Sequence, residues 1–202
     1  MRSLTCPCET VFDADLPDFV DLDASPDTVT EILNGTFLSA RCPNCGNLVK
    51  PDVSVRITSA SRSLDLQVVP ELDRWSFYRG AVSVPKGTEV VIGYRELAER
   101  IRESQDGLSH AAMEIIKYFL LARAEQDSPE ADIVIEYAGR EDDRLEFDIW
   151  GLKEGEAGLI RVPDALYQKT LSELPRKSAE EPFSRIFSGT YRSIRILEAD
   201  PE

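Results

Sequence analysis

The sequence predicts an α+β protein, and three patterns support this class. Residues 53–58 and 64–69 alternate apolar and polar side chains, as half-buried strands joined in a hairpin do. Residues 94–105 and 109–125 instead repeat apolar side chains at helical spacing. After residue 131, three further strand patterns and a helix indicate a small α+β appendage at the C-terminal end.

A short helix is expected at 26–33, in the stretch that precedes these strands. Ser25 can cap it, Pro26 suits its first turn, and Asn34-Gly35 can end it. The preceding segment, 11–20, is acidic and aromatic, and Phe12 and Phe19 are expected to anchor it. The aspartates between 13 and 23 are expected on a solvated strand face.

Two more strands are expected at 81–84 and 89–92, separated by the turn signal Pro85-Lys86-Gly87. With the hairpin they would form an antiparallel β-meander. The aromatic segment 73–78 is expected to pack under the edge of that sheet.

The helix at 109–125 is expected to be central to the core or to a subunit interface, because apolar residues cover much of its circumference. Ser109 begins it. Its predicted inner stripe consists of Ala112, Ile115, Ile116, Phe119, Leu120 and Arg123.

The linker Asp127-Ser128-Pro129-Glu130 is the most plausible domain boundary. It separates a domain at 1–126 from the appendage at 131–202, whose expected strands are 132–137, 145–150 and 158–162. A helix at 164–174, a short helix around Phe183 and a last strand at 193–197 would complete the appendage.

The net charge of −14 sets limits on partners. Such a field repels phosphate backbones and anionic headgroups, so nucleic acid and membrane surfaces are not expected partners. A basic protein partner or plain solubility fits the charge better, and self-association into a homo-oligomer is expected to use the helix at 109–125. The N-terminus lacks the apolar core of a secretory signal, and no apolar run is long enough to span a bilayer, so a cytoplasmic protein is expected.

All four cysteines fall into two close pairs, Cys6 with Cys8 and Cys42 with Cys45, separated by 33 residues. In a reducing compartment, paired cysteines hold metal more often than they form disulfides. Four thiolates in two pairs are the ligands of a tetrahedral Zn²⁺ site. The sequence therefore predicts one structural zinc ion per chain, held in a zinc-ribbon-like module at about 1–59, followed by strands at about 60–93 and helices at about 94–126.

The second pair is the stronger signal of the two. In Cys42-Pro43-Asn44-Cys45-Gly46 the proline pre-sets the turn, and Gly46 lets the backbone curl so that amides point at the sulfurs. Cys6-Pro7-Cys8 is one residue shorter, so its amide geometry must differ. Closing the 33-residue loop costs roughly 3–4 kcal/mol, whereas structural zinc supplies about 10–16 kcal/mol.

A redox function is the main alternative for these cysteines. Cys-x-Cys followed by Cys-x-x-Cys resembles the zinc switch of a redox-regulated holdase chaperone, in which oxidation ejects zinc and unfolds the module. In that family the switch lies at the C-terminal end, whereas here the cysteines open the chain. A thioredoxin-like use of Cys42 and Cys45 is weaker, because the glycine and the second pair favour metal.

The chain as far as about residue 125 resembles the CpXC domain, a bacterial and archaeal family named for two Cys-Pro-x-Cys motifs. The similar features are the cysteine pairs, the approach LNGTFLSARCPNCG, and the segment VVIGYRELAERIRESQDGLSHAAMEIIKYFLL. The resemblance implies a zinc-binding fold of unknown function and no reaction. Cys6-Pro7-Cys8 departs from the family form by one residue.

No catalytic group stands out. His110 is the only histidine, so sites that need several histidines are excluded. It is expected to face solvent in the first turn of its helix. The acidic run at 13–23 lacks the glycine of a calcium loop, and the arginines at 185, 192 and 195 are expected on a solvated face.

Three function hypotheses follow. The leading one is a non-enzymatic, zinc-stabilised module that acts through protein–protein contact or assembly. The second is the redox-responsive zinc switch. The third is an enzyme with a site formed near the C-terminal appendage.

Overall fold

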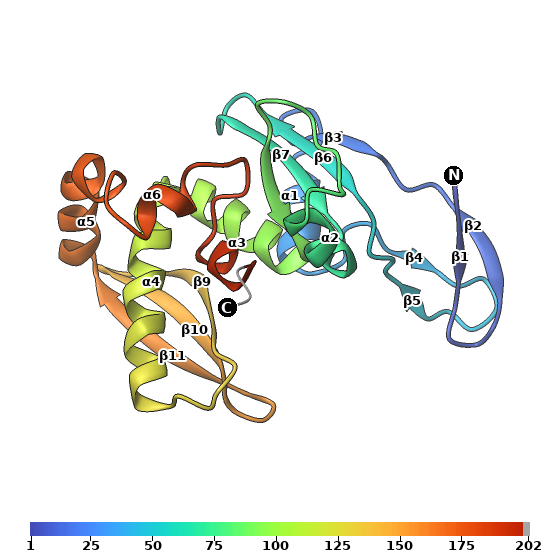
Figure 1. The fold of residues 1–202 in the computed structure, drawn as a ribbon. Helices are drawn as coiled ribbons and strands as arrows, with labels where there is room; N and C mark the ends of the chain where they lie inside the picture. Colours follow the sequence, from blue (N-terminus) through green and yellow to red (C-terminus); the bar gives the residue numbers. More distant parts are fainter. Residues whose placement is uncertain (200–202) are drawn as a thin grey trace. The chain divides into compact units, whose positions relative to one another are not determined.

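The computed structural model describes residues 1–199 and confirms the α+β class (Figure 1). The chain divides into two compact units: unit 1 is Met1–Ala98, and unit 2 begins at Glu99. Helix α3, Gly93–Gln105, passes through this division. Among the described residues, no helix is both long and apolar enough to cross a membrane.

Two small antiparallel hairpins carry the cysteine pairs of unit 1. Strands β1, Arg2–Thr5, and β2, Val11–Ala14, form the first; β4, Ala40–Arg41, and β5, Leu48–Val49, form the second. In each hairpin the two cysteines lie in the connection between the strands.

The main sheet of unit 1 is mixed and not a meander. Its order is β3 (Phe19–Asp21), β6 (Val55–Ser59), β7 (Leu64–Val69) and β8 (Glu89–Ile92). The predicted hairpin is present, because β6 and β7 pair antiparallel. However, β3 pairs with β6 and β8 pairs with β7 in the parallel sense.

The alternation of apolar and polar residues in the sequence gives the sheet one buried face and one more exposed face. Along β6, Val55, Ile57 and Ser59 are buried while the residues between them are partly exposed. Arg56 pairs with Asp65 of β7 at 2.9 Å on the more exposed face. One face therefore packs into the core of unit 1, as alternation requires.

The connection from β7 to β8 explains why the meander prediction is wrong. Parallel neighbours need a long crossover, and residues 70–88 supply it through a 3₁₀ turn, Glu71–Asp73, and a short helix, α2, Arg74–Tyr78. The predicted strand at 81–84 lies in this crossover and is irregular.

The aromatic residues of the segment 73–78 lie on α2 and differ in burial. Trp75 is 56% exposed, contrary to the prediction that this segment packs under the sheet, whereas Phe77 and Tyr78 are partly buried. The buried residue is Arg74, whose guanidinium pairs with Glu71 and Glu96.

Helix α1, Asp27–Leu33, confirms the predicted short helix, which buries Val29 and Ile32. Its end at Asn34-Gly35 is also as predicted, since Gly35 has φ of +73°. Ser25 does not cap it: the N-cap is Pro26, without a side-chain hydrogen bond, and the Ser25 amide bonds to the Asp21 carbonyl.

Unit 2 consists of helix α4 packed on a three-stranded antiparallel sheet (Figure 1). The order is β11 (Glu156–Pro163), β10 (Arg144–Lys153), β9 (Val134–Glu141), close to the predicted strands. Helix α4, His110–Asp127, is capped by the Ser109 side chain, which accepts from the Ala112 amide. Their shared core is formed by Leu108, Ala112, Met113, Ile116, Ile135, Tyr137, Leu145, Phe147, Ile149, Val162 and Tyr167.

The inner face of α4 differs in part from the predicted stripe. Ala112, Ile115 and Ile116 are buried as expected, and Met113 joins them. Phe119 is 51% exposed and Arg123 is exposed, so neither belongs to the core.

The C-terminal segments form a second apolar core of unit 2 together with Ile115 of α4. Its other buried members are Phe183, Ile186 and Ile194. Helix α5 is Asp164–Lys177 and α6 is Phe183–Ile186, in the places predicted for them. The predicted strand at 193–197 is wrong: the chain forms a 3₁₀ helix, Ile194–Ala199. The Ile194 amide donates to the Glu114 carboxylate of α4 at 2.6 Å, and not to the backbone of a neighbouring strand.

The division between the units falls within α3, whereas the predicted domain boundary lies at 127–130 and remains a prediction. In the structure, α4 shares a core with β9, β10 and β11. The helix on the N-terminal side of the linker is therefore part of the same compact unit as the strands that follow it.

Strand β10 offers a matched pair for testing the core of unit 2. Leu145→Ala should lower the free energy of unfolding by about 2–5 kcal/mol, because Leu145 is fully buried. Leu152→Ala on the same strand, 44% exposed, should change it by less than about 1 kcal/mol. Urea unfolding followed by Trp150 fluorescence in a Trp75→Phe background checks this, and equal losses for both variants would contradict it.

Candidate metal centre

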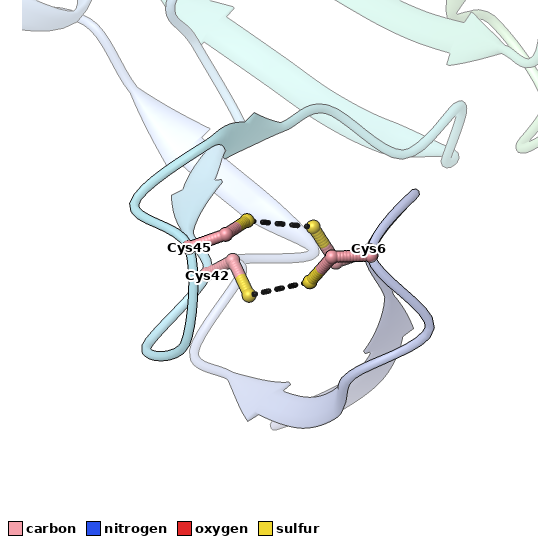
Figure 2. A group of neighbouring side chains, drawn as sticks. Cys6, Cys42 and Cys45 are labelled. Atoms are coloured by element: carbon pink, nitrogen blue, oxygen red, sulfur yellow. Dashed lines mark hydrogen bonds between the residues drawn. The ribbon is translucent and has the colours of Figure 1, made fainter.

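The four cysteines meet in unit 1 (Figure 2). Their sulfur atoms all lie within 4.8 Å of one another. Cys6 Sγ is 3.5 Å from Cys45 Sγ, and Cys8 Sγ is 3.7 Å from Cys42 Sγ. Each close contact joins one hairpin to the other, so residues more than 30 positions apart in the chain form one cluster.

The sulfur geometry fits a tetrahedral metal and not a pair of disulfides. All four cysteines are free, and a disulfide would bring two sulfurs to about 2.0 Å. Zn–S bonds of about 2.3 Å place the sulfurs of a tetrahedral site about 3.8 Å apart. Cys6 and Cys42 are buried while Cys45 is exposed, so the cluster lies at the surface of unit 1 with one side closed.

The second loop has the predicted knuckle geometry. Gly46 has φ of +74°, and its amide bonds to the Cys42 carbonyl at 2.9 Å. Backbone hydrogen bonds from Cys45 and Asn44 lower the pKa of Cys42, which favours its thiolate. The backbone of Asn47 acts in the same direction on Cys45, but the neighbouring thiol of Cys8 and burial oppose it, and the pKa of Cys45 is raised.

The shorter first loop reaches a similar result with a different residue. Glu9 directly follows Cys8, as Gly46 follows Cys45, and it too is left-handed, with φ of 67°. The amide of Cys8 points at the Cys6 sulfur and the amide of Thr10 at the Cys8 sulfur. The missing residue therefore does not prevent the sulfurs from receiving amide donors, although Glu9 adopts a conformation that glycine tolerates better.

Four thiols this close cannot all ionise without a cation. Hydrogen bonds from Thr10 lower the pKa of Cys8 to about 5, and the amide of Cys45 lowers the pKa of Cys42. The Cys8 amide lowers the pKa of Cys6, but burial and the neighbouring thiols outweigh it and raise that pKa to about 12. A divalent metal would neutralise the charge that these groups share.

Unit 2 contains a second cluster of titratable groups, which sequence reasoning did not identify. Glu103, His110 and Glu114 place ligand-type atoms within 4.8 Å of one another. Lys117 Nζ lies 2.7 Å from Glu114 and 2.9 Å from Glu99. The available signal was the presence of Glu114 and Lys117 inside the otherwise uncharged run 111–122.

The prediction that His110 faces solvent is wrong. The histidine is 16% exposed, and its Nδ1 lies 2.8 Å from Glu103 Oε2. Burial by itself lowers the pKa of His110, but the carboxylate of Glu103 outweighs burial and raises the pKa to about 9. His110 therefore carries a positive charge at neutral pH.

The acidic groups of this second cluster already have cationic partners. Glu99, Glu103 and Glu114 face Arg100, His110 and Lys117. Burial raises the pKa of Glu99 to about 7, which further reduces the negative charge of the cluster near neutral pH. Glu114 is also occupied by the Ile194 amide. We therefore interpret the cluster as a buried ion-pair network, and the sulfur cluster as the candidate metal centre.

The two cysteine loops can be compared by substitutions at their left-handed residues, Glu9 and Gly46. Glu9→Gly should raise the free energy of unfolding of unit 1 by up to about 1 kcal/mol, because it removes a strained left-handed side chain. Gly46→Ala should lower it by about 1 kcal/mol, since an added Cβ meets no atom within 4 Å and only the backbone is strained. Urea unfolding with metal present, followed by Trp75 fluorescence in a Trp150→Phe background, measures both, and a loss in both variants would contradict the comparison.

The raised pKa of His110 predicts a pH dependence for unit 2. A folded pKa of about 9 against an unfolded pKa of about 6.5 stabilises the fold below pH 6.5, and this stability is lost as the pH rises through 9. His110→Gln should therefore cost roughly 1–3 kcal/mol at pH 6 and clearly less at pH 9.5. Urea titrations of wild type and variant, read by Trp150, test this, and a constant difference across the two pH values would refute it.

Comparison with known proteins finds a similar protein and a matching family model. An uncharacterized protein from Treponema pallidum (strain Nichols) is 27% identical over 220 residues, covering 99% of this chain and all of the relative. No solved structure matches the chain. The model of the CpXC family, described as CpXC protein, matches residues 4–117, more than half of the chain and all four cysteines. The chain belongs to the CpXC family.

Proposed function

We propose that this protein is a zinc-stabilised binding module, in which Cys6, Cys8, Cys42 and Cys45 hold one Zn²⁺ and unit 1 presents a surface to a protein partner. The observation that carries the metal site is the convergence of four sulfurs from two separate hairpins to within 4.8 Å. An all-cysteine donor set selects zinc over the hard cations magnesium and calcium.

The proposed zinc has a structural function. Four thiolates fill a tetrahedral shell, which leaves no position for a substrate or a water nucleophile. Hairpins with strands as short as Ala40–Arg41 and Leu48–Val49 are not stable by themselves. A metal that ties them together supplies the missing stability and holds fixed the loops that flank it. A protein partner remains the favoured class of ligand, because the net charge of −14 repels nucleic acid and anionic membranes and is complementary to a basic protein surface.

One observation favours the redox switch as a second candidate function. Cys8 and Cys45 are the exposed members of the cluster, and they come from different hairpins, so an oxidant in solution could reach a thiolate on each side. Loss of either thiolate would release the metal and separate the hairpins.

Metal analysis tests the leading proposal. Purified, reduced protein should contain one zinc per chain, and Cys8→Ser or Cys42→Ser should reduce this content severely because three thiolates close the site poorly. Asn44→Ala is the matched loop variant: it removes an amide 3.8 Å from Cys8 Sγ and should keep the stoichiometry while weakening affinity about tenfold. A chelator should unfold unit 1, reported by Trp75, and leave the Trp150 signal of unit 2 unchanged.

Absence of metal in protein that was never exposed to chelator would reject the proposal, and another metal at full stoichiometry would correct its identity. Mild peroxide separates the two candidate functions. Zinc release with exposure of apolar surface supports the switch, and zinc retention rejects it.

A further inference from the structure

Unit 1 contains a groove of about 620 Å³ whose walls meet around the edge strand β3. Phe19 and Asp21 of β3 form one wall, and Thr28 and Glu31 of α1 contribute to another. The volume lies in the range of pockets that hold small ligands or short peptide segments. None of these residues belongs to the sulfur cluster.

The cysteine hairpins supply the remaining walls. Asp15 and Leu16 directly follow β2 of the first hairpin, while Arg41 and Leu48 come from the two strands of the second. Arg41 is adjacent to Cys42 and also bonds the Gly46 carbonyl at 3.3 Å. The sulfur cluster therefore joins the two hairpins that both contribute to the lining of the groove.

Strand β3 exposes backbone hydrogen-bonding groups to this groove. It is an edge strand, paired with β6 alone among the described strands. The Asp18 carbonyl accepts from Arg56 and the Leu22 amide donates to Thr58, each at 2.9 Å. In a parallel pair alternate residues face the neighbour, so the amide and carbonyl of Phe19 point to the open edge. An added strand could pair there.

The side chains around this edge favour a particular chemistry. Phe19 is 55% exposed and Leu48 is 48% exposed, so each offers apolar contact. The charged groups of the lining are the carboxylates of Asp15, Asp21 and Glu31, against the single cation Arg41. An acidic groove with apolar contacts and an open strand edge is complementary to an extended, basic and partly apolar segment.

We propose that unit 1 binds an extended segment of a partner protein, carrying lysine or arginine beside an apolar anchor, as an added strand along β3. This inference rests on the proposed zinc-stabilised binding module and names its class of ligand. The anchor contacts Phe19 and Leu48, the basic side chains face the carboxylates, and the peptide backbone pairs with Phe19. The metal contributes by holding the hairpin walls in position.

A library of random linear peptides displayed on phage, selected on the full-length zinc-loaded chain, tests this. Enriched peptides should be basic and should bind more weakly as salt rises. Their synthetic forms, measured by fluorescence anisotropy, should lose at least about tenfold in affinity with Phe19→Ser and with the double variant Asp15→Asn, Glu31→Gln. Methylation of alternate backbone nitrogens of the peptide should abolish binding, because it removes the donors of the added strand.

Matched controls come from the first hairpin. Val11 is a 63% exposed apolar strand residue outside the groove, and Asp13 is an exposed carboxylate nearby. Val11→Ser and Asp13→Asn should bind the peptides as wild type does. Circular dichroism and zinc content, measured on every variant, exclude misfolding as the cause of a loss.

The outcomes are distinguishable. Failure to enrich any peptide, enrichment of acidic peptides, or peptides that bind the groove variants as well as wild type would overturn the groove assignment while the zinc content stays intact. Absence of zinc would instead reject the metal centre. Concentration-dependent dimerisation that Phe19→Ser abolishes, with no peptide selected, would assign the groove to a second copy of the chain and also overturn the proposal.

Discussion

Contact between two pairs of sulfurs is the constraint on which unit 1 depends. The hairpins β1–β2 and β4–β5 have strands of two to four residues, too short to be stable alone. They are brought together where Cys6 meets Cys45 and Cys8 meets Cys42. Everything that lies between the hairpins in sequence, including β3 and α1, is thereby enclosed in a loop whose ends are fixed.

Unit 2 is stabilised by apolar packing. Its sheet and α4 share a continuous apolar core, and no close cysteine pair is needed. At one side of that core, however, the chain buries a network of carboxylates and cations around Glu103, His110 and Lys117. Such a network adds little net stability compared with apolar packing, but removing one member leaves an uncompensated charge. The amides of Tyr137 and Ile194 bond to Glu99 and Glu114, so the network also fixes β9 and the C-terminal turn against the helices.

Local patterns predicted most elements correctly where a single segment determines its own structure. The alternation of β6 and β7, the helical spacing of α3 and α4, and the end of α1 at Gly35 all depend on neighbours in sequence. The predictions that failed depend on how elements pack against one another. The segment at 81–84 has strand-like composition, but its place in the parallel crossover leaves it no strand to pair with. His110 was expected in solvent because it lies in the first turn of a helix, but the turn between α3 and α4 brings it against Glu103 of the preceding helix.

The sequence by itself determined which residues can bind a metal, because four cysteines in two close pairs leave few chemical alternatives, and it determined the α+β class through its periodicity. Only the tertiary structure decided that the four sulfurs meet, that Glu9 adopts a left-handed conformation in the shorter loop, and that α4 is buried against β9–β11. It alone placed Asp15, Phe19, Glu31 and Leu48 around one groove. The physical reason is that spacing along the chain fixes local turns and faces, whereas contacts between segments depend on how loops close and which strands pair.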